Sequence, residues 1–141
     1  MVGTFFGHRD TPDQVRPRLR AVLLDLIERR GVTQFYVGTH GNFDAMAREL
    51  LAELERSHGI RYTVVLSALP KKADPLCESD HTILPEGIET VPPRFAVSYR
   101  NKWMIARSDI VVTHVNRSFG GAAQGKALAE KKKKTVIELA K

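Results

Sequence analysis

The alternation of short apolar runs with longer amphipathic segments is the feature of this sequence that most restricts its fold. Runs rich in β-branched and aromatic residues, typical of strands, cover residues 2–7, 35–38, 61–66, 109–115 and 135–139. Strands that alternate with helices build a parallel sheet with helices on both of its faces. The sequence therefore predicts one α/β domain over residues 1–141, a Rossmann-like three-layer α/β/α sandwich of about five mainly parallel strands.

The segments between these strands have the apolar spacing of helices. The predicted helices cover residues 11–30, 42–58, 94–107 and 120–131. Gly31 and Gly59 are expected to end the first two helices, and Asn42 is expected to cap the second.

Residues 70–93 break the pattern, because they hold several prolines and no helical stripe. We expect a long loop insertion there, since loops of this length in compact domains often cover a site or a partner surface. Ile83, Leu84 and Ile88 are expected to pin the insertion to the body or to form a short strand.

Composition indicates a globular, cytoplasmic protein. Hydrophobic residues make up 43% of the chain, yet no apolar run approaches the ~20 residues that a membrane helix needs. Cys77 is the single cysteine, so an internal disulfide is excluded. The net charge of +6 resides partly in residues 131–134, which we expect to be a solvated helix end. Contact of this lysine run with nucleic acid is the minor alternative.

The sequence has no motif with catalytic or metal-binding spacing. Its five histidines and one cysteine lack the spacing of zinc ligands, and no nucleophile elbow is present. Cys77 has acidic neighbours, which do not activate a thiol. We therefore predict no catalytic residue, no metal and no cofactor.

Three predicted strand ends combine glycines with polar residues, which a purely structural turn does not require. In open parallel sheets, ligands bind at the carboxyl ends of the strands. We therefore predict a ligand site at these ends, made by Gly7, His8, Arg9, Thr39, His40, Gly41, Asn42, Asp44, Asn116, Ser118, Gly120, Gly121 and Gln124.

Individual roles at this site follow from side-chain chemistry, with structural alternatives. Gly120 and Gly121 open a helix, whose free N–H groups either hold an anion or simply complete a tight turn. Arg9 suits a bidentate phosphate contact, and His8 either reaches the ligand or caps a loop. Asp44 either complements the helix dipole or accepts a hydrogen bond from a ligand hydroxyl.

The third predicted helix adds Arg94, Arg100 and Trp103 to the candidate site. Arg100 and Trp103 are three residues apart, so they can share a helix face and sandwich a nucleobase. The alternative is that Trp103 belongs to the core while Arg100 is solvated.

Four blocks of the sequence, residues 5–9, 35–44, 93–104 and 118–123, together resemble a small bacterial and phage branch of the SLOG superfamily. This superfamily also holds DprA/Smf and the LOG phosphoribohydrolases, and the resemblance covers nearly the whole chain. It implies a Rossmann-like fold that recognises nucleotides or nucleotide-derived signals, including NAD-derived ones such as cyclic ADP-ribose. It also implies a homo-oligomer, a dimer or higher.

The departures from the LOG pattern bear on catalysis. LOG enzymes carry a helical arginine, matched by Arg100, and a Pro-Gly-Gly-x-Gly-Thr-x-x-Glu loop, of which this chain keeps the glycine pair. Phe119 replaces the proline, Ala123 the third glycine and Gln124 the threonine. Ala127 replaces the glutamate that would be the catalytic acid, and alanine cannot assist proton transfer. The resemblance therefore implies ligand binding without cleavage.

Three functions stay open at this point. The first is a binding module that senses its ligand, or a phage sponge that sequesters an immune second messenger. A stand-alone domain is expected to fit sequestration and, equally well, a subunit that signals to a separate partner. The second is a LOG-like hydrolase of nucleotide N-glycosidic bonds that uses Asp44 or Glu130. The third is DprA-like binding of single-stranded DNA.

Overall fold

A six-stranded sheet forms the centre of the computed structural model, which describes residues 1–68 and 81–140. The strands follow the order β4-β3-β2-β1-β5-β6, and every neighbouring pair is parallel. Their bounds are β1 Val2–Gly7, β2 Gln34–Val37, β3 Arg61–Val65, β4 Thr82–Ile83, β5 Ile110–His114 and β6 Thr135–Glu138. The predicted α/β fold is confirmed, with one strand more than expected.

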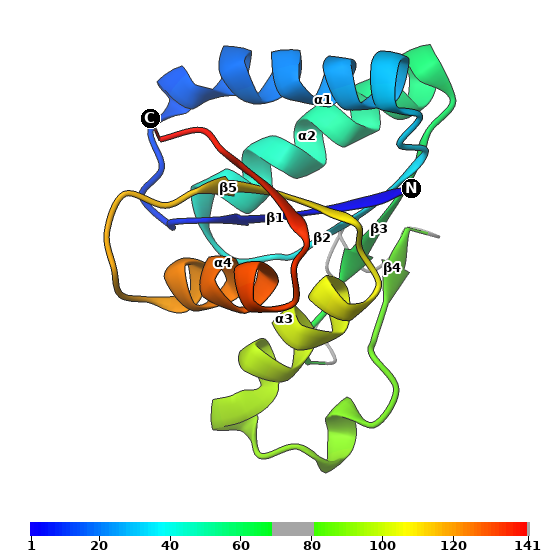
Figure 1. Cartoon of the computed structure of the whole chain (residues 1–141). Helices are drawn as coiled ribbons and strands as arrows, with labels where there is room; N and C mark the ends of the chain where they lie inside the picture. The colour runs from blue at the N-terminus through cyan, green and yellow to red at the C-terminus, as the bar shows by residue number, and fades with distance from the viewer. Residues whose placement is uncertain (69–80, 141) are drawn as a thin grey trace.

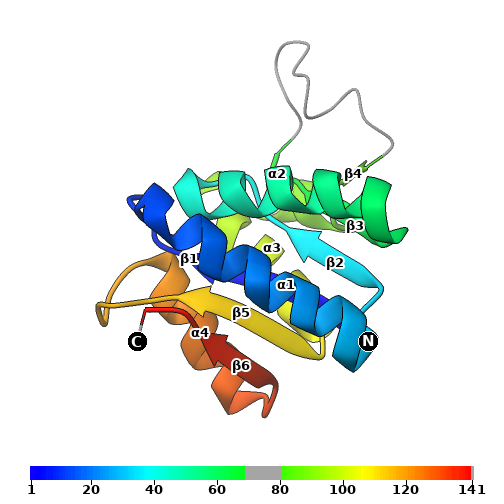
Figure 2. The ribbon, with the colours of Figure 1, turned by 90° about the horizontal axis from the view of Figure 1, so that it is seen from above.

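Helices cover both faces of the sheet, with α1 and α2 on one face and α3 and α4 on the other (Figures 1 and 2). The helices of the described residues are α1 Arg16–Arg30, α2 Gly41–His58, α3 Ala96–Ala106 and α4 Gly121–Lys131, with 3-10 turns at Asp13–Val15, Ile88–Thr90 and Pro93–Phe95. Gly31 and Gly59 end α1 and α2, as predicted. No helix in the described ranges is both long and apolar enough to cross a bilayer.

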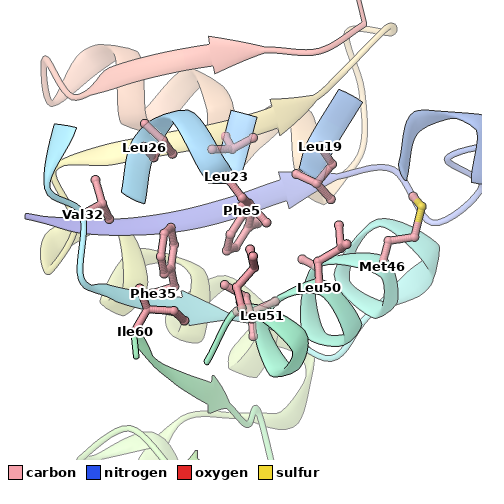
Figure 3. Packing of buried hydrophobic residues seen from close by; sticks show 14 of the residues in the cluster. Phe5, Leu19, Leu23, Leu26, Val32, Phe35, Met46, Leu50, Leu51 and Ile60 are labelled. Atoms are coloured by element: carbon pink, nitrogen blue, oxygen red, sulfur yellow. The ribbon is translucent and has the colours of Figure 1, made fainter. Parts of the chain in front are cut away.

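Two hydrophobic clusters fill the sandwich, one on each face of the sheet. The larger cluster lies between the sheet and helices α1 and α2, where Phe5 stacks on Phe35 with ring centroids 5.8 Å apart (Figure 3). The smaller cluster joins Phe6 of β1 to Met104 of α3 and Ala129 of α4. Successive strand residues point to opposite faces, so Phe5 and Phe6 anchor β1 to both helical layers.

The expected cap of the second helix is wrong. α2 begins at Gly41 with His40 as its N-cap residue, and Asn42 lies within the first turn. The Nδ2 group of Asn42 instead donates to the Thr11 carbonyl at 2.7 Å and to Asp13 Oδ1 at 2.8 Å. Asn42 does not cap α2 because it lies inside the first turn, and its amide instead ties the helix to the segment that follows β1.

The expected insertion over residues 70–93 falls only partly within the described residues, because residues 69–80, Cys77 among them, lie outside. Downstream of that gap, β4 pairs in parallel with Val64 and Val65 of β3. Ile88 is 4% exposed. The expected short strand and apolar anchor are therefore confirmed, and this strand is the additional one in the sheet.

The chain reverses its direction of travel across the sheet after β4, once β4 has been added beyond β3. It adds β2 and β3 on one side of β1, and later β5 and β6 on the other. The carboxyl ends of β1 and β5 and the start of α4 lie together at one end of the sheet, on the left in Figures 1 and 2. Open α/β sheets bind ligands at such a switch point.

Candidate functional site

A cleft of about 420 Å³ opens at this switch point. It is bordered by the end of β1, the start of α2, one side of α3 and the loop between β5 and α4. Eight predicted site residues line it together: Gly7, His8, Arg9, His40, Asp44, Arg100, Gly120 and Gly121. The volume lies in the range of pockets that hold small molecules.

The first turn of α4 faces this cleft without a side-chain cap. Gly120 is the N-cap residue, and no acidic residue lies in the first turn. Gly120 has φ 96° and ψ 171°, a region that is essentially restricted to glycine. Gly120, Gly121 and Ala122 all line the cleft. An anion that enters therefore meets free N–H groups and the positive end of the helix dipole.

Asp44 is a buried carboxyl group in the first turn of α2, 7% exposed. Its Oδ2 accepts a hydrogen bond from the backbone N–H of His40 at 3.0 Å. Burial raises the pKa of Asp44 to about 6, although the His40 N–H and the Arg100 cation oppose the shift. A Cβ at Gly38 would lie 2.8 Å from Oδ2 and 3.0 Å from Arg100 Nη1. Among the described residues Oδ1 makes no hydrogen bond, so this oxygen is available to a ligand.

Arg100 is held in the cleft wall by neutral partners. It is 2% exposed, and burial lowers its pKa. Nη1 donates to the Val65 carbonyl at 3.2 Å and to Thr39 Oγ1 at 3.4 Å, and Nε donates to Asn101 Oδ1 at 3.0 Å. Because a guanidinium stays protonated even when buried, these bonds fix a positive charge at one position of the cleft.

The contacts of Arg100 also fix the tautomer of His40. Nη2 of Arg100 donates to Nδ1 of His40 at 3.2 Å. A guanidinium has no acceptor, so Nδ1 accepts and the neutral ring carries its proton on Nε2. Burial, followed by the Arg100, Arg9 and Arg48 cations, lowers the pKa of His40. The ring is therefore neutral at pH 7 and offers an N–H donor.

Arg117, on the opposite wall, is more exposed and is paired with a carboxylate. Its Nη1 and Nη2 donate to the two carboxylate oxygens of Asp10, at 3.1 and 2.8 Å. The pair raises the pKa of Arg117 and lowers that of Asp10. Nearby, the buried His8 accepts a hydrogen bond at Nε2 from the backbone N–H of Asn116 at 3.2 Å, and burial, then Arg117, lower its pKa. These bonds tie the loops after β1 and β5 together.

The structure does not bring Trp103 and Arg100 together on one face. The Trp103 ring meets Tyr36 edge-on, with centroids 5.1 Å apart, and the guanidinium of Arg107 lies 4.0 Å from its centroid. It borders a separate hollow beside Tyr99. The solvated Arg100 of the alternative interpretation is contradicted by its burial. Trp103 instead packs half-buried because α3 turns it toward β2.

Seven other predicted residues also do not line the cleft: Thr39, Gly41, Asn42, Arg94, Asn116, Ser118 and Gln124. The first three, and the backbone of Asn116, hold the segments around the cleft in place. Gly41, for example, has φ 88°, and a Cβ there would lie 2.5 Å from the Cα of Arg9. Ser118 and Gln124 are exposed. Arg94 is exposed with its guanidinium over the Phe95 ring.

Eight lining residues were not predicted: Phe5, Phe6, Val97, Asn101, Met104, Arg117, Phe119 and Ala122. Arg117 and Phe119 share a loop with the predicted glycines, so proximity in sequence was an available signal. Val97 and Met104 follow from Arg100 by helical spacing once that residue is known to face the cleft. Phe5 and Phe6 carry only a strand signal, which does not distinguish core from cleft.

Comparison with family models and curated proteins supplies no template for this cleft. No family model matches the chain, and no curated protein matches it. Membership of the SLOG superfamily therefore stays a prediction. Within residues 1–68 and 81–140, no cluster of histidine, cysteine, aspartate or glutamate is arranged to hold a metal ion.

Proposed function

We propose that the protein binds a phosphorylated, nucleotide-derived small molecule in the cleft at the β1–β5 switch point. The observation that carries the proposal is the uncapped first turn of α4, where Gly120 and Gly121 line the cleft. Backbone N–H groups at a helix N-terminus bind phosphate through hydrogen bonds and through the helix dipole. Glycine at both positions lets a phosphate approach the backbone closely.

The charge of the cleft supports an anionic ligand. Arg9, Arg100 and Arg117 line it, whereas Asp44 is the one carboxyl group among the described lining residues. Burial keeps that carboxyl protonated up to about pH 6. Guanidinium groups bind phosphate through paired N–H donors. Asp10 occupies both terminal nitrogens of Arg117, so an entering phosphate competes with Asp10 for them.

The α2 side of the cleft suits the hydroxyl-bearing part of such a ligand. His40 supplies an N–H donor at Nε2, and Asp44 supplies Oδ1. Asn101 uses its Oδ1 to accept from Arg100, which leaves its NH₂ group as a donor. A sugar hydroxyl both donates and accepts hydrogen bonds, so this mixed set of groups complements a ribose.

Binding without cleavage is the activity we favour. Ala127 lies where the LOG resemblance requires a glutamate, and it is exposed on α4, outside the cleft. Glu130 is also exposed and also lies outside the cleft. Helix α4 therefore gives the cleft no carboxyl group that could act as the acid of a glycosidic cleavage.

Hydrolysis of an N-glycosidic bond is the second candidate, and one observation favours it. Asp44 lines the cleft with a free Oδ1, and burial raises its pKa to about 6. A general acid works best when its pKa lies near the operating pH. In this candidate function Asp44 would protonate the leaving base, and Glu130 would have no role.

A thermal-shift screen, followed by ligand recovery, tests both candidates. The purified protein is mixed with AMP, NAD, ADP-ribose isomers or ribose 5-phosphate, and any stabilising compound is recovered after denaturation. Intact recovery supports binding, whereas a free base with a ribose phosphate supports hydrolysis. A flat screen, with no compound raising the melting temperature, would contradict both. Gly121→Asp is the control, because its carboxylate would repel an anion at α4.

We propose that the protein senses or sequesters such a ligand in the cytoplasm, where it acts as a homo-oligomer. A phage sponge would be one form of sequestration. Sequestration requires slow release and no chemical change, whereas sensing requires a ligand-dependent change in another molecule. Stopped-flow displacement measures the release rate directly, and light scattering measures the oligomeric state.

A further inference from the structure

Two exposed phenylalanines stand out among the described residues, and each has an arginine against its ring. Phe95 is 51% exposed, with the Arg94 guanidinium 4.8 Å from the ring centroid. Phe119 is 68% exposed, with the Arg117 guanidinium 5.5 Å from the ring centroid. Only Phe119 lines the cleft. Comparing Phe95 with Phe119 therefore distinguishes a general feature of the surface from a feature of the candidate site.

The surroundings of Phe119 hold its ring at the mouth of the cleft. Arg117 approaches the ring and is itself anchored on Asp10 by two hydrogen bonds. On its other side Phe119 is followed by Gly120, whose φ of 96° turns the chain into α4. A large apolar ring exposed at this place has no packing partner that would explain it within the described residues.

We propose that Phe119 is a stacking platform for the nucleobase of the ligand, and that the cleft selects base-bearing nucleotides over sugar phosphates that lack a base. This inference rests on the proposed binding function. An aromatic ring stacks on the flat face of any base, and Arg117 beside the ring adds a cation that also attracts a π-system.

The spacing in the loop supports this arrangement. Two peptide bonds separate Phe119 from Gly121, so their Cα atoms lie within about 8 Å of each other. A base on Phe119 and a phosphate on the first turn of α4 are then neighbours, and one ribose spans the interval between them. Asp44 and His40 line the same cleft, so they can bind the hydroxyl groups of that ribose.

Matched substitutions test the platform by calorimetric titration with AMP, ADP-ribose and ribose 5-phosphate. Phe119→Leu should weaken binding of the adenine compounds about tenfold or more, and it should leave ribose 5-phosphate binding unchanged. Phe95→Leu, which removes the same kind of Arg–Phe pair outside the cleft, should change neither. Phe119→Tyr should keep the affinity of the wild type.

A second variant gives an optical readout of stacking. Trp103 is the one tryptophan of the chain, so Phe119→Trp combined with Trp103→Phe leaves a single indole at the cleft. Adenine nucleotides should quench its fluorescence, and ribose 5-phosphate should not.

The outcomes distinguish this inference from the function on which it rests. If Phe119→Leu weakens the adenine compounds and ribose 5-phosphate equally, or weakens neither, the platform is overturned while ligand binding stands. If Phe119→Leu dissociates a homo-oligomer without changing adenine affinity, the ring packs on a second copy and the platform is again overturned. Failure of the wild type to bind any of these three compounds or any other compound of the thermal-shift screen overturns both proposals.

Discussion

Two helices begin at the cleft, and they differ in how their first turns are satisfied. α2 carries its own carboxyl group, Asp44, which accepts a hydrogen bond from the N-cap residue His40 and is buried. α4 begins with Gly120 and Gly121, without a side-chain cap and without an acid in its first turn. The same secondary-structure element thus presents a closed end on one wall and an open end on the other.

The difference teaches where an anion can bind. A carboxyl group in the first turn takes up the electrostatic benefit that a phosphate would otherwise gain. The start of α2 is therefore suited to neutral hydroxyl groups, and the start of α4 is suited to phosphate. The arginines also differ, because Arg100 is buried and its hydrogen-bond partners are neutral, whereas Arg117 is more exposed and is paired with the Asp10 carboxylate.

The largest expected effect is on the wall of the cleft that holds the buried Arg100, which we call the buried wall. The wall that holds Arg117 and the start of α4 is the open wall. Arg100→Leu removes the donors that satisfy the Val65 carbonyl and His40 Nδ1. Loss of several buried hydrogen bonds should lower the free energy of unfolding by about 3–4 kcal/mol, measured by urea denaturation. Arg117→Leu is the matched control on the open wall, and its urea midpoint should match that of the wild type. Equal losses in the two variants would remove the distinction between the walls.

A smaller effect is expected from the carboxyl group that closes α2. The folded protein keeps the Asp44 proton up to about pH 6, whereas the unfolded chain releases it near 3.8. Unfolding therefore releases a proton between these values, so the contribution of Asp44 to stability is complete below pH 3.8 and is lost as the pH rises through 6. Asp44→Asn keeps an acceptor for the His40 N–H but has no proton to release, so it does not lose this stability as the pH rises.

The measurement is the difference in unfolding free energy between the wild type and Asp44→Asn across pH 4 to 7. The unfolding free energy of the variant should increase relative to that of the wild type as the pH rises. At pH 7 the variant should be about 2–3 kcal/mol more stable. A difference that stays constant across this range would mean that Asp44 titrates normally.

The shape of the open wall depends on the backbone conformation of Gly120, so the substitution that should reduce stability most on this wall is at that residue. Gly120→Ala forces an alanine to φ 96° and should cost about 1–2 kcal/mol of unfolding free energy. Gly121→Ala is the control, because its φ is negative and no atom lies within 4 Å of an added Cβ. Thermal denaturation of the two variants should separate them, and equal melting temperatures would show that α4 starts elsewhere.

The smallest effect concerns the exposed ion pair on the open wall. Asp10→Asn frees both terminal nitrogens of Arg117 for a ligand. Its urea midpoint should not move, because exposed ion pairs contribute little to stability. Titration with ADP-ribose should show slightly tighter binding, and the gain should fade at high salt. Weaker binding would mean that Asp10 orients Arg117 rather than competing with the ligand.

Much of the candidate site was predictable from the sequence because the carboxyl ends of the strands can be recognised in the sequence pattern. Gly7 to Arg9, His40 and the Gly120–Gly121 pair all follow strands, and all line the cleft. The prediction was weakest on α3. Its spacing allowed Trp103 to share a face with Arg100 and left a core Trp103 with a solvated Arg100 equally open, because spacing on one helix does not say which neighbouring element each side chain meets.

The sequence by itself determined the elements, the parallel sheet and the end of the sheet at which ligand-competent residues gather. These are consequences of local periodicity and of the rule that parallel strands share one carboxyl edge. Only the tertiary structure decided which helix start is open and which is closed. Burial of Asp44 and Arg100 depends on Gly38 leaving room between them. Such desolvation arises from contacts between segments far apart in the chain, which no local pattern records.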